Sequence, residues 1–221
     1  MICITGDIHA DLTRFKHKNI KKLRKNDSLI ICGDFGFIWD GSKKEQRILK
    51  KLGKKRYNIL FVDGCHENYD LLNKYEVKEW NGGQVRAISG RLMQLMRGNV
   101  YKLGDQKLFA FGGGQSDDID IRRSANTWWK EEIPTVEEIN YAMKNLEANG
   151  NIVDYIITHE PPAAFKDFLK IDTEQKSEMN TYFDTVKTSC NFKRWFFGKY
   201  HINKVIPPQY QAVFDDVIKI N

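Results

Sequence analysis

Short apolar runs recur along the chain, and many of them stop at a Gly, Asp or His residue. Runs of this kind, rich in β-branched and aromatic residues and bounded by turn residues, are typical of buried β-strands. We expect a strand at each of the clearest runs, which are residues 2–5, 29–32, 59–62, 108–111, 155–158 and 195–197.

Between several of these runs, apolar residues recur at the spacing of a helix. Residues 12–24 and 44–52 each predict an amphipathic helix. The clearest helix begins at Thr135, which can form a capping box with Glu138, and it ends at Gly150. Its expected apolar stripe consists of Ile139, Met143 and Leu146.

Strands that alternate with helices favour an α/β fold with much parallel pairing. Residues 84–111 differ, because the strand-like runs 85–88, 92–96 and 100–103 follow one another closely with Gly turns between them. This pattern indicates antiparallel pairing and a layered sandwich instead of a simple doubly wound sheet. No repeat or linker divides the chain, so we expect one domain over residues 1–221.

The composition is that of a globular protein. Of the 221 residues, 41% are hydrophobic and 29% are charged, which excludes collagen-like, disordered and coiled-coil chains. Lys and Arg number 35 against 29 Asp and Glu, and the net charge of +6 favours anionic partners. Much of the excess lies in residues 14–25 and 43–56, which we interpret as solvated helix faces; a nucleic-acid patch is the alternative.

We expect neither a membrane span nor a signal peptide. No apolar run approaches the length of a membrane-spanning helix, and the N-terminus leads directly into the first predicted strand. Cys3, Cys32, Cys65 and Cys190 have no CxxC spacing and indicate reduced thiols in a cytoplasmic protein. Cys3 and Cys32 lie in apolar runs and are expected in the core.

Residues that can bind a metal collect just past the predicted strands. They are Asp7, His9, Asp34, His66, His159 and His201. In open α/β sheets, ligands bind at the carboxyl ends of the strands. One histidine after a strand is usually a satisfied polar residue, but here four of the five histidines occupy such places. Imidazole and carboxylate groups together suit Zn, Mn or Fe better than Ca.

In their order along the chain, these motifs resemble those of the calcineurin-like metallophosphoesterases. That family has D-x-H, G-D, G-N-H-[DE], a lone His and G-H-x-H after successive strands. The corresponding segments here are residues 7–9, 33–34, 64–67, 158–159 and 198–201. Each motif alone is weak, but the ordered set is specific and spans nearly the whole chain.

The resemblance implies an α/β fold, a four-layer αββα sandwich of two mixed sheets flanked by helices. It also implies two metal ions at the strand ends, with a metal-activated water that attacks a phosphoryl group and an acid that protonates the leaving group. The roles carried over by position are first-ion ligands Asp7, His9 and His201, a bridging Asp34, a second-ion ligand His159 and a general acid His66.

Two positions depart from the family pattern. Cys65 stands where the family has Asn, and Lys199 where it has His, and both would bind the second ion. A Cys65 thiolate could still coordinate and would favour Zn or Fe, whereas an ammonium has no lone pair. Three outcomes stay open: a weakened second metal site, a one-metal enzyme with Lys199 as a phosphate clamp, or a protein that binds a phosphorylated ligand without hydrolysing it.

Two arginines are candidate substrate-binding residues, in addition to Lys199. The guanidinium groups of Arg122 and Arg123 have the right geometry for a phosphate group. The alternative for these arginines is a surface ion pair with Asp118 or Asp120.

We therefore predict a metal-dependent phosphoesterase that hydrolyses a phosphomonoester or phosphodiester, with His66 as general acid and Asp34 at the catalytic centre. Its cofactors would be one or two divalent ions (Mn, Fe or Zn), and its substrate a phosphorylated small molecule or a nucleotide. Activity would be reduced if one dication is lost, because electrostatic stabilisation is usually the largest catalytic term. The alternative is a degenerate member that binds a nucleotide or nucleic acid without efficient hydrolysis.

Overall fold

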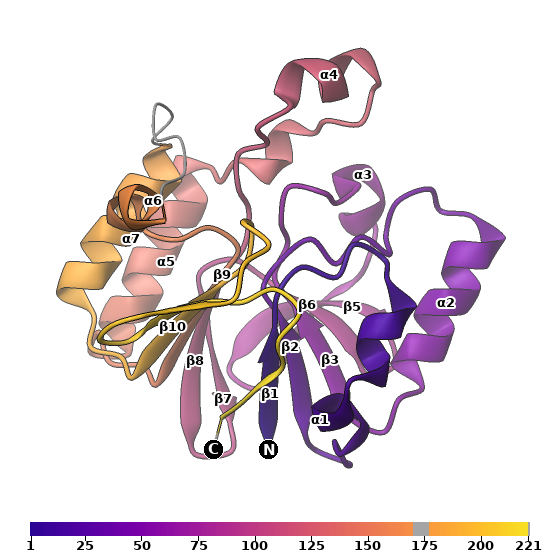
Figure 1. Ribbon diagram of the computed structural model, residues 1–221, viewed down its shortest axis with the longest axis horizontal. Helices are drawn as coiled ribbons and strands as arrows, with labels where there is room; N and C mark the ends of the chain where they lie inside the picture. Colours follow the sequence, from indigo (N-terminus) through magenta and orange to yellow (C-terminus); the bar gives the residue numbers. More distant parts are fainter. Residues whose placement is uncertain (170–176, 221) are drawn as a thin grey trace.

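Two mixed β-sheets pack face to face in the computed structural model, which describes residues 1–169 and 177–220 (Figure 1). The first sheet has the order β13 (Ile218–Ile220), β1 (Ile2–Thr5), β2 (Ser28–Ile31), β3 (Asn58–Phe61), β6 (Leu92–Leu95), β5 (Gly83–Ser89), β4 (Val77–Trp80). The second has the order β11 (Lys204–Ile206), β12 (Tyr210–Ala212), β10 (Arg194–Phe197), β9 (Tyr155–Thr158), β8 (Gln106–Phe111), β7 (Asn99–Leu103).

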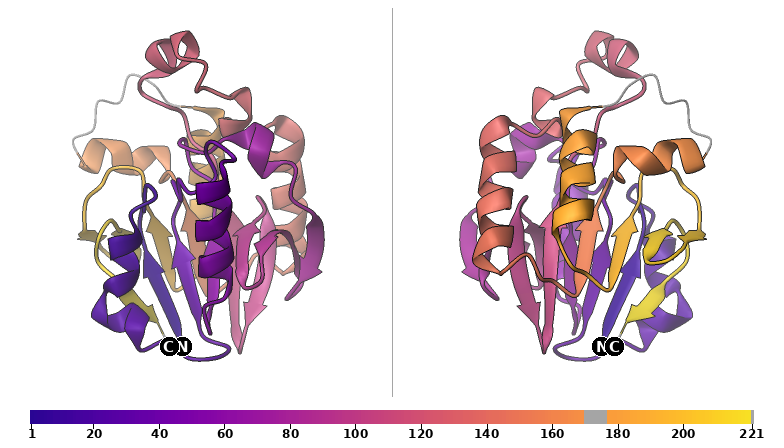
Figure 2. Two further views of the ribbon diagram at one scale, coloured as in Figure 1. Left: turned by 90° about the vertical axis from the view of Figure 1, so that its right-hand side faces the viewer. Right: turned by 90° about the vertical axis from the view of Figure 1, so that its left-hand side faces the viewer.

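Helices cover the outer face of each sheet, so the four-layer sandwich expected from the sequence is confirmed (Figures 1 and 2). The first sheet is covered by α1 (Lys18–Lys21) and α2 (Lys43–Gly53), and the second by α5 (Val136–Ala148) and α7 (Glu178–Ser189). The shorter elements are η1 (Leu12–Lys16), α3 (Tyr69–Leu72), α4 (Ile119–Ser124), η2 (Lys130–Glu132) and α6 (Ala163–Phe168).

Alternate side chains of each central strand enter different layers. In β1, Ile2 and Ile4 join the apolar cluster between the two sheets, while Cys3 joins the cluster under the helices of the first sheet. In β10, Phe196 lies between the sheets, whereas its neighbour Trp195 packs under the helices of the second sheet. Successive side chains of a strand point to opposite faces, so strands buried on both faces read as continuous apolar runs.

The centre of each sheet is parallel. Strands β1, β2, β3 and β6 run parallel in the first sheet, and β8, β9, β10 and β12 do so in the second. The carboxyl ends of these strands therefore reach the same end of the molecule, above which Figure 1 shows α3 and α4. The loops that carry the metal-binding candidates leave the sheets at this end.

The middle of the chain is antiparallel as expected, but it does not form one sheet. Strands β4, β5 and β6 pair antiparallel at the edge of the first sheet. The chain then crosses to the second sheet, where β7 and β8 pair antiparallel. The layered sandwich thus arises because this segment contributes an antiparallel edge to both sheets.

The helix expected over residues 12–24 is wrong in detail. These residues form η1 and α1, which are separated at His17, whose backbone angles (φ −55°, ψ 140°) are not helical. The His17 Nδ1 atom accepts a hydrogen bond from the Asn19 amide at 3.2 Å and caps α1. A polar side chain that caps the N-terminus of a helix by accepting from a free backbone amide thus interrupts an apparently continuous helical pattern of apolar residues.

The other two expected helices are confirmed as α2 and α5. The capping box between Thr135 and Glu138 is present in α5. Its apolar stripe differs from the prediction, because Met143 is 39% exposed and Ala142 is buried in its place beside Leu146. Ala142 lies against Gly98, whose lack of a side chain leaves room for this close approach.

A buried charge network joins the two halves of the fold. The Arg97 guanidinium donates to Asp63 Oδ2 from Nη2 (2.6 Å) and Nε (2.9 Å), and from Nη1 to Glu138 Oε2 at 2.9 Å. Asp63 follows β3 of the first sheet, whereas Glu138 lies in α5 beside the second. The Asp63 carbonyl also accepts from the Gly113 amide at 2.8 Å, which ties together the loops after β3 and β8.

Replacing Arg97 with methionine is expected to lower the free energy of unfolding by about 3–5 kcal/mol, because Asp63 would become an unpaired buried carboxylate. Urea unfolding followed by circular dichroism measures this loss. The matched control is Lys78→Met, which breaks an exposed ion pair with Glu76 (3.0 Å) and should change stability little. Equal losses in the two variants would contradict the prediction.

Two further sequence expectations concern the thiols and membrane insertion. All four cysteines are free and buried, and Cys3 and Cys32 lie in the core as predicted. None of the helices within residues 1–169 and 177–220 combines the length and the apolar character that crossing a membrane requires.

Candidate metal centre

The predicted metal-binding residues lie in loops that follow parallel strands of both sheets. Asp7 and His9 follow β1, Asp34 follows β2, and His66 follows β3 in the first sheet; His159 follows β9 and His201 follows β10 in the second. The structure brings all six side chains into three overlapping groups, in each of which the ligand atoms lie within 4.8 Å of one another. The site therefore lies at the junction of the two sheets.

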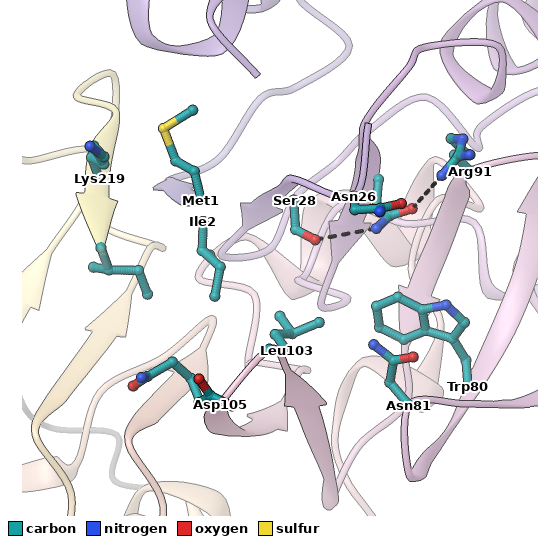
Figure 3. Close-up of a pocket in the computed structure, with 14 residues that line it drawn as sticks. Met1, Ile2, Asn26, Ser28, Trp80, Asn81, Arg91, Leu103, Asp105 and Lys219 are labelled. Carbon is teal, nitrogen blue, oxygen red and sulfur yellow. Dashed lines mark hydrogen bonds between the residues drawn. The ribbon is translucent and has the colours of Figure 1, made fainter. Parts of the chain in front are cut away.

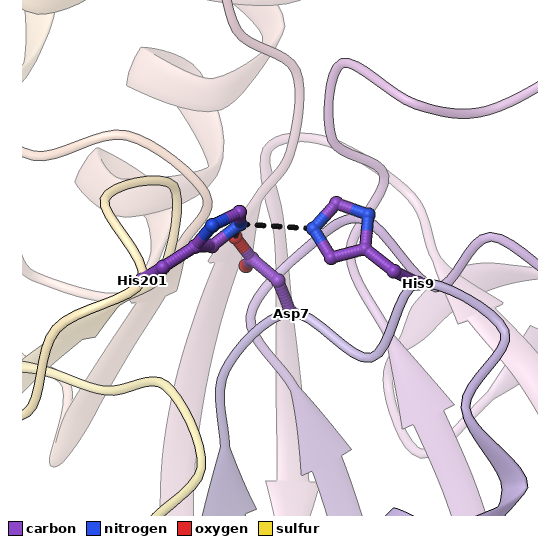
Figure 4. Close-up of side chains that lie close together, drawn as sticks. All are labelled: Asp7, His9 and His201. Carbon is purple, nitrogen blue, oxygen red and sulfur yellow. Dashed lines mark hydrogen bonds and ion pairs between the residues drawn. The ribbon is translucent and has the colours of Figure 1, made fainter.

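The first group consists of Asp7, His9 and His201 (Figure 4). The Nε2 atoms of His9 and His201 face each other at 2.9 Å, and His201 Nε2 lies 3.1 Å from Asp7 Oδ2. Two imidazole nitrogens and one carboxylate oxygen thus converge on one point from two loops, those after β1 and β10. This donor set fits a divalent Zn, Mn or Fe ion.

Asp34 connects this group to the other two. Its Oδ1 atom accepts a hydrogen bond from the His66 backbone amide at 2.8 Å, and its Oδ2 atom lies 2.8 Å from His66 Nδ1. His159 lies on the other side, with Nε2 3.5 Å from Asp34 Oδ1 and Nδ1 3.5 Å from Asp7 Oδ1. His159 Nε2 is fully buried without a hydrogen-bond partner among the described residues, as a nitrogen aimed at a metal would be.

Burial and charge act against each other at this centre. Burial opposes ionisation of Asp34, but the neighbouring His159 and His66 outweigh it and hold the pKa of this carboxyl well below its usual range. Burial likewise opposes protonation of His159, yet Asp34 and Asp7 raise its pKa above the ordinary value. Asp7, Asp34 and His159 thus form a buried cluster in which the carboxylates need positive partners, a role that a cation would also fill.

The backbone at the site is strained. His9, Asp34, Lys199 and His201 have left-handed φ angles of 46°, 39°, 69° and 51°. Residues other than Gly, Asn and Asp rarely adopt this region, and such strain persists where the surrounding structure enforces it, often at functional sites. The sharp turns after β1, β2 and β10 direct these side chains inward instead of along the strand.

The glycines of the motifs allow the loops to approach the ligands closely. A Cβ atom at Gly64 would lie 2.1 Å from Asp34 Oδ1, and one at Gly198 would lie 2.2 Å from Asp7 Oδ1. Neither position could hold a larger residue without displacing a buried carboxylate. The glycine that precedes each of these site segments is therefore explained by close packing against the Asp34 and Asp7 carboxylates.

The two positions that depart from the family pattern contact each other. Lys199 Nζ donates to Cys65 Sγ at 3.1 Å and to the Gln115 carbonyl at 2.5 Å. Burial raises the pKa of the Cys65 thiol. Burial disfavours the Lys199 ammonium, but Cys65 and Glu160 outweigh it and raise its pKa above the ordinary value. Cys65 belongs to none of the candidate metal groups found among the described residues.

The two candidate arginines have different surroundings. Arg122 is buried, and its ion-pair partner is Glu132 (Nη1 to Oε2, 3.2 Å) instead of Asp118 or Asp120. Its Nη2 and Nε atoms donate to the Thr127 carbonyl at 2.7 and 3.0 Å, so the guanidinium is largely engaged within the protein. Arg123 is exposed and stacks over the Trp128 ring at 4.2 Å.

Several residues that hold the site were missed by sequence reasoning. Glu67 is fully buried, and its Oε1 atom accepts from the Phe35 amide at 2.7 Å, which fixes the turn that carries Asp34. Arg14, expected on a solvated helix face, is half-buried and donates to the Asp7 carbonyl at 2.8 Å. The place of Glu67 directly after His66, within the motif of residues 64–67, could have indicated its role. No local feature of the sequence distinguishes Arg14 from its basic neighbours.

A separate cavity of about 730 Å³ lies at the opposite end of the strands (Figure 3). It is lined by residues at the amino ends of the central strands, among them Met1 and Ser28, together with Trp80 and Arg91. None of the predicted site residues lines it. The metal-binding cluster and this cavity are therefore distinct features.

The αββα sandwich gathers histidines and aspartates at its strand ends, in groups that could hold a metal ion. The family model described as calcineurin-like phosphoesterase matches residues 1–202. The chain therefore belongs to the calcineurin-like phosphoesterase family, as the motifs predict.

Among the solved structures that match is one with low sequence identity to this chain. It is a Staphylococcus aureus protein provisionally assigned as a 5′-nucleotidase, in complex with alpha-ketoglutarate, with 12% sequence identity and a TM-score of 0.49. The alignment covers 96% of this chain and 48% of that chain, so this chain spans about half the length of the relative. Comparison with curated proteins gives no significant match.

Proposed function

We propose that the protein is a metal-dependent phosphoesterase that hydrolyses a phosphomonoester or phosphodiester of a small molecule or nucleotide. The observation that carries this proposal is the convergence of Asp7, His9 and His201 beside Asp34 at the junction of the two sheets. Membership of the calcineurin-like phosphoesterases supports the hydrolysis of a phosphate ester.

Asp7, His9 and His201 would hold a divalent ion of Zn, Mn or Fe, with Asp34 at its side. Such an ion, when bound, supplies Lewis-acid activation of a phosphoryl oxygen and a nucleophile derived from water. The residues fit this role because their ligand atoms already lie close together, brought there by the loops after β1 and β10. Asp7 is buried, whereas the His9 and His201 side chains are partly exposed.

His66 is the proposed general acid. Its Nδ1 atom lies 2.8 Å from Asp34 Oδ2, and a carboxylate at this place accepts the Nδ1–H and fixes the ring. Nε2 is then the ring atom that can pass a proton to the departing oxygen. The side chain is 43% exposed, so the ring reaches the open side of the centre where a substrate would lie. Asp34 thus has two functions, since it borders the ion and positions the acid.

Of the two candidate arginines, Arg123 is the better candidate for a substrate phosphate. It is exposed, and the Trp128 ring orders its guanidinium without occupying its donors. The Arg122 donors are engaged by Glu132 and Thr127.

The proposal is tested with chelator-treated protein reloaded with Mn²⁺, Fe²⁺ or Zn²⁺ and assayed with bis(p-nitrophenyl) phosphate and p-nitrophenyl phosphate. We expect hydrolysis of at least one ester that requires reloading and that Ca²⁺ does not restore. Folded, metal-loaded protein that cleaves neither ester with any of the three ions would overturn the proposal.

One observation favours a second candidate function, the binding of a phosphorylated ligand without efficient hydrolysis. The Lys199 ammonium lies beside Cys65, where the family pattern has metal ligands. Calorimetric titration with a nucleoside monophosphate separates the two functions, because tight binding with no turnover supports the second and turnover supports the first.

A further inference from the structure

The three ligand groups define two positions for a cation on either side of Asp34. One position is formed by Asp7, His9 and His201, whereas the other lies toward the buried His159. The first is lined only by side chains with lone pairs to donate. The second differs, because an ammonium group borders it.

Lys199 is fixed at the His159 side by several contacts. Its Nζ atom lies 3.1 Å from Cys65 Sγ, 2.5 Å from the Gln115 carbonyl and 3.8 Å from Glu160 Oε1. The side chain is only 9% exposed, and its backbone amide donates to Asp7 Oδ2 at 3.0 Å. Lys199 therefore belongs to the wall of the centre and is not a mobile surface residue.

The groups around the ammonium are packed into one cluster. The Cys65 thiol accepts a hydrogen bond from Lys199 Nζ at 3.1 Å. A Cβ atom at Gly114 would lie 2.9 Å from Cys65 Sγ, 3.0 Å from Glu160 Oε1 and 3.1 Å from His159 Cδ2. The thiol, the carboxylate and the imidazole thus lie close together around Gly114, and Lys199 contacts the first two of them.

The charge of Lys199 is balanced by a carboxylate built into the fold. Glu160 is 1% exposed. Its Oε2 atom accepts from Asn180 Nδ2 at 2.8 Å and its Oε1 atom from the Gln115 amide at 2.7 Å. A buried carboxylate held in this way requires a positive partner. Two lysines supply it here, Lys199 next to the centre (Nζ to Oε1, 3.8 Å) and Lys166 (Nζ to Oε2, 3.6 Å).

These contacts do not suit a second dication. Lys199 has no lone pair to give, the Cys65 thiol already receives a hydrogen bond from it, and the ammonium repels any cation placed beside His159. We propose that the centre binds one divalent ion, at Asp7, His9 and His201, and that the Lys199 ammonium is a permanent cation in place of a second ion. The inference rests on the metal-binding part of the proposed function.

A metal count of the intact protein tests this assignment. Chelator-treated protein is titrated with Mn²⁺ in a calorimeter, and the reloaded, desalted protein is analysed by mass spectrometry for Mn per chain. We expect one ion per chain for the natural sequence. The double variant Cys65→Asn/Lys199→His supplies two ligands and removes the ammonium, so we expect two ions per chain.

The matched control is Cys65→Asn alone, which supplies a ligand but keeps the ammonium, and for which we expect one ion. Circular dichroism and thermal unfolding confirm that each variant is folded. The assignment is overturned by two ions in the natural sequence, by two ions in Cys65→Asn, or by a folded double variant that still binds one.

The count also separates this inference from the proposed function. One ion without hydrolysis overturns the phosphoesterase proposal and leaves the assignment of Lys199 intact. Two ions with hydrolysis overturn the assignment and leave the phosphoesterase intact. A protein that binds no Mn²⁺ overturns both.

Discussion

Replacing Asp7 with asparagine is expected to remove the bound ion and to lower kcat/KM by about 10³-fold or more. Asp7 is fully buried, and its two oxygens lie 3.1 Å from His201 Nε2 and 3.5 Å from His159 Nδ1. Asparagine has nearly the same shape but no charge, so the variant removes the anion and preserves the packing. Metal content and hydrolysis of bis(p-nitrophenyl) phosphate, measured on the same preparation, check both effects.

Asp105→Asn is the matched control for this variant. Asp105 is exposed and lines the cavity at the amino ends of the strands, far from the histidine cluster. We expect its metal content and rate to equal those of the natural sequence. An Asp7→Asn protein that keeps its ion and hydrolyses the ester within tenfold of the natural rate would contradict the assignment of Asp7.

Replacing His66 with glutamine is expected to slow hydrolysis in a way that depends on the leaving group. For an alkyl phosphate ester, whose departing alkoxide needs a proton, the loss should be about 10²–10⁴-fold in kcat. For a p-nitrophenyl ester the departing phenolate is stable without a proton, and the loss should be much smaller. Glutamine can still hydrogen-bond Asp34, so metal content should stay unchanged.

His17→Gln is the control, because His17 caps α1 and lies outside the cluster. We expect this variant to hydrolyse each of the two esters at the rate of the natural sequence. If His66→Gln slows the alkyl and p-nitrophenyl esters by the same factor, His66 acts through position or binding and not as a proton donor.

The central strands and the loops that carry the ligands were predictable because each depends on local sequence. A strand buried on both faces, such as β1, must be apolar throughout, and its end is marked by the Gly6-Asp7 turn. Parallel pairing then places the carboxyl ends of β1, β2 and β3 together. The grouping of Asp7, His9 and Asp34 follows from topology alone.

Interactions between distant segments were not predictable in the same way. Arg97 and Asp63 are 34 positions apart, and nothing around either residue indicates that both are buried as a pair. Lys199 and Cys65 were each identified as departures, but their contact at 3.1 Å needs both loops in place. The short outer strands lack the apolar pattern of a buried strand. In β11, for example, Lys204 and Val205 are exposed.

Both departures from the expected helices involve contacts that helical periodicity does not contain. His17 accepts a hydrogen bond from the Asn19 amide where the first helix breaks, and Ala142, buried in place of Met143, lies against Gly98. Helical periodicity describes which residues can share a face, whereas capping and neighbouring backbone decide where a helix stops and how it is turned.

Because the ligands come from both sheets, the centre cannot exist in either half of the chain. Asp7 and His201 are separated by almost the full sequence, and they meet only after β10 has joined its sheet and the sheets have docked. Ion binding is thereby coupled to the assembly of both sheets. An ion that binds only this assembled state stabilises it by mass action, so the resistance of the protein to unfolding reports on how much metal is available.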